Sequence, residues 1–384
     1  MKRIGILGST GSIGVQTLEI IKKSLNKFSV DYLYADSNYK VLYDQIEIFS
    51  PDYACINNKK SYKKLSQLIG KQCKTKLILG EDESLKMIAS RKVDLVLNGI
   101  VGIDGLKSTI AAIKNNIDVA LSNKESLVLA GEIVNKLAKK YNVNIFPVDS
   151  EHSAIWQCLK GESKKDINKI ILTASGGPFR KLAKESFSNI TVKEALKHPN
   201  WEMGNKITID SATMMNKGFE VIETYYLFNI HQNNIEVLVH PESIVHSMVE
   251  FNDKSIKAQL GYPDMKIPIN YALNYPIHSN LEVDSLDLSK ISHLTFEKPD
   301  LDKFKCIKLA YKALEMGGTA TAALNIANDF LVDLFLNEKI SFIDIPKYIE
   351  YAIDKHPHSS NPSLEEIYNL MDWIKNSLIK EIKI

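Results

Sequence analysis

Short apolar runs alternate with amphipathic stretches of helical period along the first 148 residues. Runs rich in Val, Ile, Leu and Tyr predict seven strands, at Ile4–Leu7, Val30–Tyr34, Tyr53–Ile56, Leu77–Leu79, Leu95–Leu97, Val119–Leu121 and Ile145–Val148. Amphipathic helices are predicted between several of them, at Ser12–Lys23, Tyr39–Phe49, Gly105–Asn115 and Glu125–Lys140. The alternation predicts an α/β fold with an N-terminal, Rossmann-like, doubly wound parallel sheet.

The pattern changes after residue 148. Val245–Phe251 and Ser255–Leu260 alternate apolar and polar positions on either side of Asn252-Asp253, which predicts a β-hairpin in an α+β domain. Residues 281–303 are acidic and irregular, and helical periodicity follows from Phe304 almost to the end. The expected parts are a dinucleotide-binding domain at 1–148, a catalytic domain at 149–280 with a mobile loop near 198–205, a linker at 281–303 and a C-terminal helical bundle at 304–384.

Composition narrows the possible classes of function. The 48 Lys and Arg residues nearly balance 46 Asp and Glu residues, which argues against a nucleic-acid binder. We interpret the many lysines as a solvated surface. No apolar run reaches the ~20 residues that span a bilayer, and Met1-Lys2-Arg3 leads directly into the first strand, so we expect a cytoplasmic protein. The four cysteines lack zinc-site spacing and are expected to be reduced and buried; they are Cys55, Cys73, Cys158 and Cys306.

A glycine-rich turn follows the first strand, in the order Gly8-Ser9-Thr10-Gly11-Ser12-Ile13-Gly14. Glycines allow the backbone to approach a pyrophosphate, and the following helix start is positive, so the turn predicts dinucleotide binding. The second strand ends at Asp36-Ser37-Asn38-Tyr39-Lys40. Asp36 favours the ribose hydroxyl of NAD, whereas Ser37, Asn38 and Lys40 suit the 2′-phosphate of NADP, so these residues leave both cofactors open.

Carboxylates gather after the seventh predicted strand. Asp149 and Glu151 lie at i and i+2, on one side of the chain if the backbone stays extended, and Glu220 offers a third acid. Such oxygen donors suit Mg²⁺ or Mn²⁺, although acids at strand ends also cap helices.

Further polar segments suit a phosphorylated substrate. Asp210-Ser211 has the composition of a helix start, which would gather Ser211, Asn216 and Lys217 around an anion. The loops 173–179 and 198–204 each combine hydrogen-bonding groups, glycine and one aromatic residue, which is typical of a lid. His240 and His246 are interpreted as hydrogen-bonded groups beside a strand.

Together and in this order, the motifs closely resemble the 1-deoxy-D-xylulose 5-phosphate reductoisomerase family over nearly the whole chain. The matching segments are Gly8–Gly14, Leu121–Ser126, Asp149–His152, Ser175–Gly177, His198–Trp201, Asp210–Glu220, His240–Met248, Gly261–Met265 and Gly317–Ala327. The resemblance implies an NADPH-dependent homodimer of the non-mevalonate isoprenoid route that requires Mn²⁺ or Mg²⁺. Such an enzyme rearranges its ketose phosphate and reduces the resulting aldehyde to 2-C-methyl-D-erythritol 4-phosphate.

The resemblance also implies a role for individual residues. The metal ligands would be Asp149, Glu151 and Glu220, and with Lys124 these would form the catalytic group. Substrate contacts would come from Lys124, Ser150, Glu151, Ser175, His198, Trp201, Ser211, Asn216, Lys217 and Glu220. Cofactor contacts would come from Thr10, Gly11, Ser12, Ile13, Ser37, Asn38, Asn123, Glu125 and Gly204.

The chain departs from the family at one position of consequence. Members often carry glycine followed by lysine or arginine where this chain has Asp36-Ser37, so the usual cation beside the 2′-phosphate is missing there. Two alternatives remain: a metal-independent dehydrogenase of another phosphorylated carbonyl compound, and a non-catalytic dinucleotide sensor. The first would need a nucleophilic cysteine or general-base histidine, and the second gives no role to three acids beside a phosphate pocket.

Overall fold

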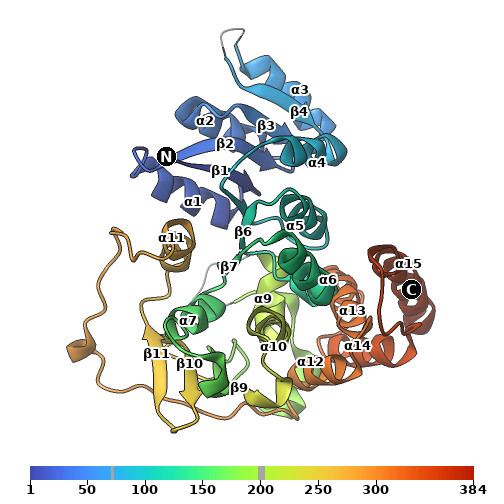
Figure 1. Ribbon diagram of the computed structural model, residues 1–384. Helices are drawn as coiled ribbons and strands as arrows, with labels where there is room; N and C mark the ends of the chain where they lie inside the picture. The colour runs from blue at the N-terminus through green and yellow to red at the C-terminus, as the bar shows by residue number, and fades with distance from the viewer. Residues whose placement is uncertain (71–72, 198–203) are drawn as a thin grey trace. The chain divides into compact units, whose positions relative to one another are not determined.

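The computed structural model describes residues 1–70, 73–197 and 204–384 (Figure 1). These residues form two compact units. The first unit comprises Met1–Ser126, Val134–Ser153 and Asp264–Val283, and the second comprises Leu127–Ile133, Ala154–Pro263 and Asp284–Ile384. The four-part division expected from the sequence stays a prediction.

The first unit is built on a seven-stranded sheet of order β4-β3-β2-β1-β5-β6-β7, in which every neighbouring pair is parallel. The strands are β1 Lys2–Leu7, β2 Phe28–Ala35, β3 Tyr53–Ile56, β4 Lys76–Leu79, β5 Leu95–Asn98, β6 Asp118–Leu121 and β7 Ile145–Pro147. All seven coincide with the predicted strands to within two residues at either end. The strand order reverses between β1 and β5, so the carboxyl ends of these two strands mark the place where folds of this kind bind ligands.

Helices connect the strands, as the sequence predicted. They are α1 Ser12–Lys22, α2 Tyr39–Phe49, α3 Lys59–Leu68, α4 Glu81–Ser90, α5 Asp104–Lys114 and α6 Glu125–Tyr141. Two further helices do not connect these strands: α7 Ser150–Cys158 follows β7, and α11 Lys266–Asn274 comes later in the chain. From β1 the strand order runs toward one edge through β2, β3 and β4, and toward the other edge through β5, β6 and β7. Because crossovers between parallel strands are right-handed, the connecting helices of these two halves lie on opposite faces of the sheet. Accordingly α2 contacts α3, and α4 contacts α5. The α/β, doubly wound prediction is confirmed.

The second unit contains a mixed four-stranded sheet of order β11-β10-β8-β9. Its strands are β8 Ile167–Ala174, β9 Ile235–Val239, β10 Val245–Phe251 and β11 Ile256–Leu260. The predicted hairpin is confirmed, because β10 and β11 pair antiparallel across residues 252–255. Short helical segments flank this sheet, at η1 Lys164–Asp166, η2 Lys184–Asn189, α8 Val192–Ala195 and η3 Gln232–Asn234.

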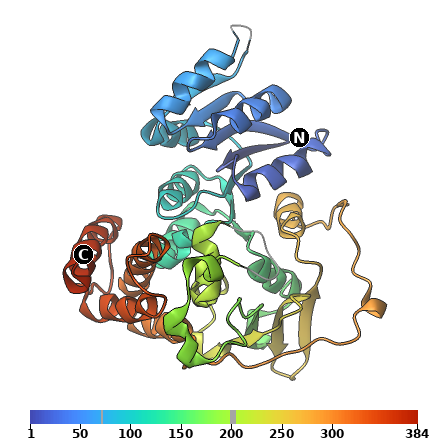
Figure 2. The ribbon, with the colours of Figure 1, turned by 180° about the vertical axis from the view of Figure 1, so that it is seen from behind.

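Longer helices complete the second unit. They are α9 Asn205–Ala212, α10 Met215–Phe228, α12 Lys305–Met316, α13 Ala320–Leu336, α14 Asp344–Lys355 and α15 Leu364–Ile382. The last four pack against one another, as the view from behind shows in red and orange (Figure 2). The predicted C-terminal helices are thus confirmed. Between α11 and α12 the chain is irregular apart from η4 Leu288–Lys290 and a bridge from Glu297 to Val239.

The structure shows the state of the four cysteines and the character of the helices in the described residues. All four cysteines are free, as predicted, and Cys55, Cys158 and Cys306 are buried; the predicted burial is wrong for Cys73, which is partly exposed. Within the described ranges, no helix combines the length and apolar character needed to cross a membrane.

Candidate active site

The glycine turn after β1 has the backbone geometry that the sequence predicted. Gly8 has a φ of +79°, and an added Cβ there would lie 2.6 Å from the carbonyl oxygen of Gly99. An added Cβ at Gly14 would lie 2.4 Å from the carbonyl oxygen of Gly8. Both glycines are therefore required by close backbone approach. Gly11 and Ser12 remain exposed at the start of α1, beside the reversal of strand order.

The carboxyl end of β2 is open to solvent. Asp36, Ser37 and Asn38 are all exposed. The Asn38 side chain accepts a hydrogen bond from the Val41 amide at 3.3 Å and so caps α2. One carboxylate oxygen of Asp36 accepts a hydrogen bond from the Asn57 amide nitrogen at 3.1 Å. The segment is a surface to which the adenosine end of a dinucleotide has access.

A buried polar network fixes the segment after β6. The side-chain amide of Asn123 donates to the Gly102 carbonyl and to the Glu125 carboxylate, each at 2.9 Å. The Asn123 side-chain oxygen accepts a hydrogen bond from the Ser126 amide at 3.1 Å. Asn123 and Glu125, both predicted to contact the cofactor, are therefore held rigidly at the carboxyl edge of the sheet.

Asp149 lies between β7 and α7, within reach of a lysine on the neighbouring segment. The Lys124 ammonium contacts its carboxylate at 2.9 Å, and the His152 ring nitrogen lies 3.6 Å from it. Burial alone raises the pKa of Asp149, but Lys124 and His152 lower it by more, so the pKa lies well below its usual range. The carboxylate is thus ionised and already paired with positive charge.

Glu151 lies in the first turn of α7, and its carboxylate accepts a hydrogen bond from the Ser150 hydroxyl at 2.6 Å. The extended i, i+2 arrangement considered for Asp149 and Glu151 does not occur, because the chain turns into the helix at Ser150. Their relative orientation is therefore set by the start of a helix rather than by the pleat of a strand.

Glu220 lies on α10 in the second unit and is fully buried. Its carboxylate accepts a hydrogen bond from the Asn216 side-chain amide at 2.6 Å and forms an ion pair with Lys217. These partners offset the cost of burying the Glu220 carboxylate, which for an unpaired charge would be roughly several kcal/mol. Asp149 and Glu151 therefore belong to the first unit, and Glu220 belongs to the second.

One local prediction is wrong. Asp210 and Ser211 lie in the last turn of α9 rather than at the start of a helix, and the next helix begins at Met215 after Met214 adopts a φ of +60°. The Asp210 carboxylate pairs with Lys206 at 2.8 Å and accepts a hydrogen bond from Asn328 at 2.8 Å. The Asp210 carboxylate thus interacts with these two side chains and not with free backbone amides at a helix start. Ser211 and Asn216 still lie close in sequence on either side of the junction between α9 and α10.

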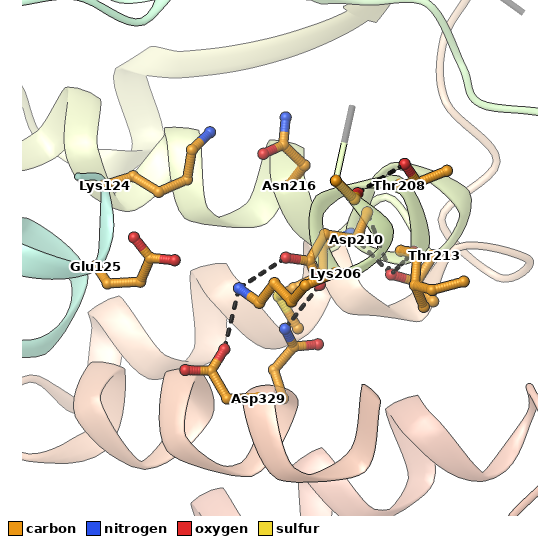
Figure 3. A network of polar contacts seen from close by, with 12 residues as sticks. Lys124, Glu125, Lys206, Thr208, Asp210, Thr213, Asn216 and Asp329 are labelled. Carbon is orange, nitrogen blue, oxygen red and sulfur yellow. Dashed lines mark hydrogen bonds and ion pairs between the residues drawn. The ribbon is translucent and has the colours of Figure 1, made fainter. Parts of the chain in front are cut away.

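Figure 3 shows the polar network at this junction. Lys206 bridges Asp210 and Asp329, the latter at 3.0 Å, and its ammonium lies 4.8 Å from the centre of the Phe219 ring. Sequence reasoning missed this network. The i, i+4 spacing of Lys206 and Asp210 was the only available signal, since Asn328 and Asp329 follow more than 110 residues later.

The remaining predicted residues lie on loops. Ser175 follows β8, and its hydroxyl accepts a hydrogen bond from the Gly177 amide at 3.4 Å. Gly204 is exposed and immediately precedes α9. His198 and Trp201 lie outside the described residues. His240 accepts hydrogen bonds from the amides of Ile244 and Val245 at 3.1 Å, which confirms its structural interpretation.

Comparison with known proteins gives a consistent result. A family model described as 1-deoxy-D-xylulose 5-phosphate reductoisomerase matches residues 4–131, and models of C-terminal domains of the same enzyme match residues 145–228 and 260–377. The 1-deoxy-D-xylulose 5-phosphate reductoisomerase of Clostridium tetani (strain Massachusetts / E88) is 51% identical over 382 residues, which is 99% of each chain. That of Thermoanaerobacter sp. (strain X514) is 49% identical over 382 residues, again 99% of each chain.

Solved structures agree with these relatives. The reductoisomerase from Zymomonas mobilis in complex with NADPH superposes with a TM-score of 0.94 at 37% identity, over 99% of each chain. A reductoisomerase in complex with NADPH, fosmidomycin and magnesium gives a TM-score of 0.94 at 40% identity, over 100% of this chain and 98% of that one. The chain therefore belongs to the 1-deoxy-D-xylulose 5-phosphate reductoisomerase family.

Proposed function

We propose that this chain converts 1-deoxy-D-xylulose 5-phosphate to 2-C-methyl-D-erythritol 4-phosphate with NADPH and a divalent metal. The observation that carries the proposal is the set of three carboxylates, Asp149, Glu151 and Glu220, whose type and number suit a metal ion. The rival without a metal gives these acids no role. A relative with 40% identity is known in complex with NADPH and magnesium, which supports the same pair of ligands here.

Asp149, Glu151 and Glu220 are the proposed metal ligands. Their donors are hard oxygens, the kind that Mg²⁺ and Mn²⁺ prefer. The lowered pKa of Asp149 keeps that ligand deprotonated, so no proton has to leave before a cation binds. The bound cation polarises the substrate carbonyl and stabilises the negative charge that develops on oxygen during rearrangement.

The glycine turn is the proposed pyrophosphate site. The close backbone contacts at Gly8 and Gly14 leave Thr10, Gly11, Ser12 and Ile13 at the start of α1, where amide groups can face the phosphates. Ser37, Asn38, Asn123, Glu125 and Gly204 complete the proposed cofactor set. The nicotinamide supplies the hydride that reduces the rearranged aldehyde.

Substrate binding is assigned to residues around the carboxylates. Ser150 and Lys124 would contact the end of the substrate near the metal, and Lys124 places a positive charge beside a developing oxyanion. Ser175, Ser211, Asn216 and Lys217 would bind the phosphate and backbone. His198 and Trp201, outside the described residues, would belong to the loop that covers the substrate and excludes water.

Neither rival gains support from the described residues. A dehydrogenase that forms a thiohemiacetal needs a reactive thiolate. Burial raises the pKa of Cys158 to about 11 and that of Cys306 to about 12, so both thiols are protonated at neutral pH. A sensor that catalyses nothing would not need a buried carboxylate such as Glu220.

Homodimerisation and a cytoplasmic location belong to the same proposal, on the strength of the family. Light scattering on the purified protein tests the first, with an expected mass of twice the 43.3 kDa of one chain.

Product identification tests the function. The full chain is incubated with 1-deoxy-D-xylulose 5-phosphate, NADPH and Mg²⁺, and the phosphate ester formed is identified by NMR. We expect 2-C-methyl-D-erythritol 4-phosphate, and we expect fosmidomycin to block its formation. Folded, metal-loaded protein that leaves the substrate unchanged would contradict the proposal and return attention to the rival dehydrogenases.

A further inference from the structure

The carboxyl end of β2 has an unusual balance of charge for a site that holds a 2′-phosphate. Asp36 and Ser37 stand where a cation would bind that phosphate directly, and Asp36 would repel it. Since the proposed function includes NADPH, positive charge has to come from Lys40, three residues further on in α2, or from another element.

Helix α3 begins beside this strand end. β2 and β3 are neighbouring parallel strands in which Ala35 pairs with Ile56, so residues 36–38 and 57–60 leave the sheet side by side. The Asn58 amide donates to the Asp36 carbonyl at 2.8 Å, and the Asn57 side chain donates to the Asp36 carboxylate at 3.1 Å. Asn58 then caps α3, so Lys59 and Lys60 are the first two residues of that helix.

The orientation of α3 brings lysines toward the same place. The Lys64 ammonium lies 5.3 Å from the centre of the Tyr39 ring, in the first turn of α2. Lys60 is four residues earlier and therefore on the same face of α3, one turn closer to the strand ends. Lys59 and Lys60 are exposed, and no ion pair occupies either one within the described ranges.

Several lysines belong to the two helices that follow β2 and β3. Lys40, Lys59, Lys60, Lys63 and Lys64 all belong to α2 or α3, whereas Asp36 is the acid at the strand end itself. One oxygen of Asp36 is already engaged by Asn57, which leaves the carboxylate less free to bind both hydroxyls of an NAD ribose.

We propose that Lys59 and Lys60 bind the 2′-phosphate of NADPH and take the place of the cation that is missing at position 37. Ser37 donates its hydroxyl to the same phosphate. Lys59 and Lys60 thereby determine the preference for NADPH over NADH. This inference rests on the proposed function, because it assumes that the glycine turn binds the rest of the dinucleotide.

Binding measurements on the full chain test this inference without relying on turnover. Isothermal titration calorimetry with NADPH, NADH and adenosine 2′,5′-bisphosphate is performed on wild type and on Lys59→Gln/Lys60→Gln. The matched control is Lys92→Gln/Lys114→Gln, which removes two exposed lysines at the opposite, amino edge of the same sheet. Lys59→Arg/Lys60→Arg keeps both charges, and thermal melting checks that every variant is folded.

We expect Lys59→Gln/Lys60→Gln to raise the Kd for NADPH about ten- to a hundredfold, since charged hydrogen bonds are lost, and to leave the Kd for NADH within about twofold. Adenosine 2′,5′-bisphosphate should lose affinity in parallel with NADPH. The arginine variant and the control should bind NADPH as wild type does. An unchanged Kd for NADPH in the glutamine variant, or an equal loss for both dinucleotides, would overturn the inference.

The proposed function can fail separately. Wild type that turns over substrate with NADPH while the glutamine variant keeps its affinity for NADPH would refute only the role of Lys59 and Lys60. Wild type that binds NADH more tightly than NADPH would overturn the inference and leave the reaction intact. Wild type that binds neither dinucleotide would refute both.

Discussion

At the scale of single residues, the candidate site depends on two carboxylates, Asp149 and Glu220, that already have positively charged partners. Lys124 and His152 hold the pKa of Asp149 well below its usual range, and Lys217 pairs with the buried Glu220. Each acid is thus matched by a cation from its own unit. A divalent ion that binds Asp149 therefore replaces an existing ion pair and does not first have to displace a proton from that carboxylate.

Replacing Asp149 by asparagine tests this arrangement at one atom. Asp149→Asn keeps the shape of the side chain but removes its charge, so we expect turnover to fall by about a hundredfold or more and to require more metal. The rate is measured against Mg²⁺ concentration. Asp82→Asn, at an exposed position on α4, serves as the control and should behave as wild type. An unaltered metal requirement in Asp149→Asn would contradict the proposed role.

The cysteines provide a second test at this scale. Burial raises the pKa of Cys55 and of Cys306 to about 12 and that of Cys158 to about 11, so these thiols form thiolates only at strongly alkaline pH. At pH 8, well below these pKa values, a thiol reagent should therefore react rapidly with the native protein only at the partly exposed Cys73. Peptide mapping identifies the labelled residue. Rapid labelling of Cys158 in folded protein would be inconsistent with the structure.

At the scale of elements, the strand-turn-helix unit at the N-terminus depends on close backbone packing. Gly14→Ala would force a Cβ to within 2.4 Å of the Gly8 carbonyl oxygen, so we expect a loss of about 1–3 kcal/mol in the free energy of unfolding. Gly11→Ala is the matched control, because its Cβ would meet the same atom at 3.4 Å, an ordinary contact. Urea unfolding of both variants measures the difference, and equal stabilities would contradict the packing.

The junction of α9 and α10 depends on the network around Lys206. Asp210 is almost fully buried, with two partners, whereas Asp329 is about one-third exposed. We expect Asp210→Asn to reduce the free energy of unfolding by about 2–4 kcal/mol and Asp329→Asn by about 1 kcal/mol or less. Chemical denaturation measures both values. A larger loss for Asp329→Asn would show that Lys206 depends mainly on the exposed acid.

At the scale of the whole molecule, periodicity predicted elements better than it predicted sites. The Tyr39–Phe49 helix and the Tyr53–Ile56 strand were located to the residue, because local apolar spacing decides such elements. The predicted helix start at Asp210 is wrong, because α9 already begins at Asn205. Asp210 lies in its last turn, where one of its partners is Asn328, 118 residues away. A short-range pattern contains no information on such a partner.

The site shows the same division. The glycine turn was predictable because its function requires specific backbone geometry, as Gly8 and Gly14 show. The ion pair between Lys124 and Asp149 joins residues on two neighbouring strand ends, and the strand order that brings them together is a property of the folded sheet. The functional roles of these residues were predicted from the family resemblance, and the comparisons confirm the family over almost the entire chain.

Metal-dependent oxidation of NADPH by the substrate is the most direct test of the account. The initial rate with 1-deoxy-D-xylulose 5-phosphate is measured for wild type with NADPH, after EDTA treatment, and after Mg²⁺ or Mn²⁺ is restored. We expect turnover that EDTA abolishes and that either cation restores. Turnover that persists in EDTA, or no turnover from folded protein with metal present, would contradict it.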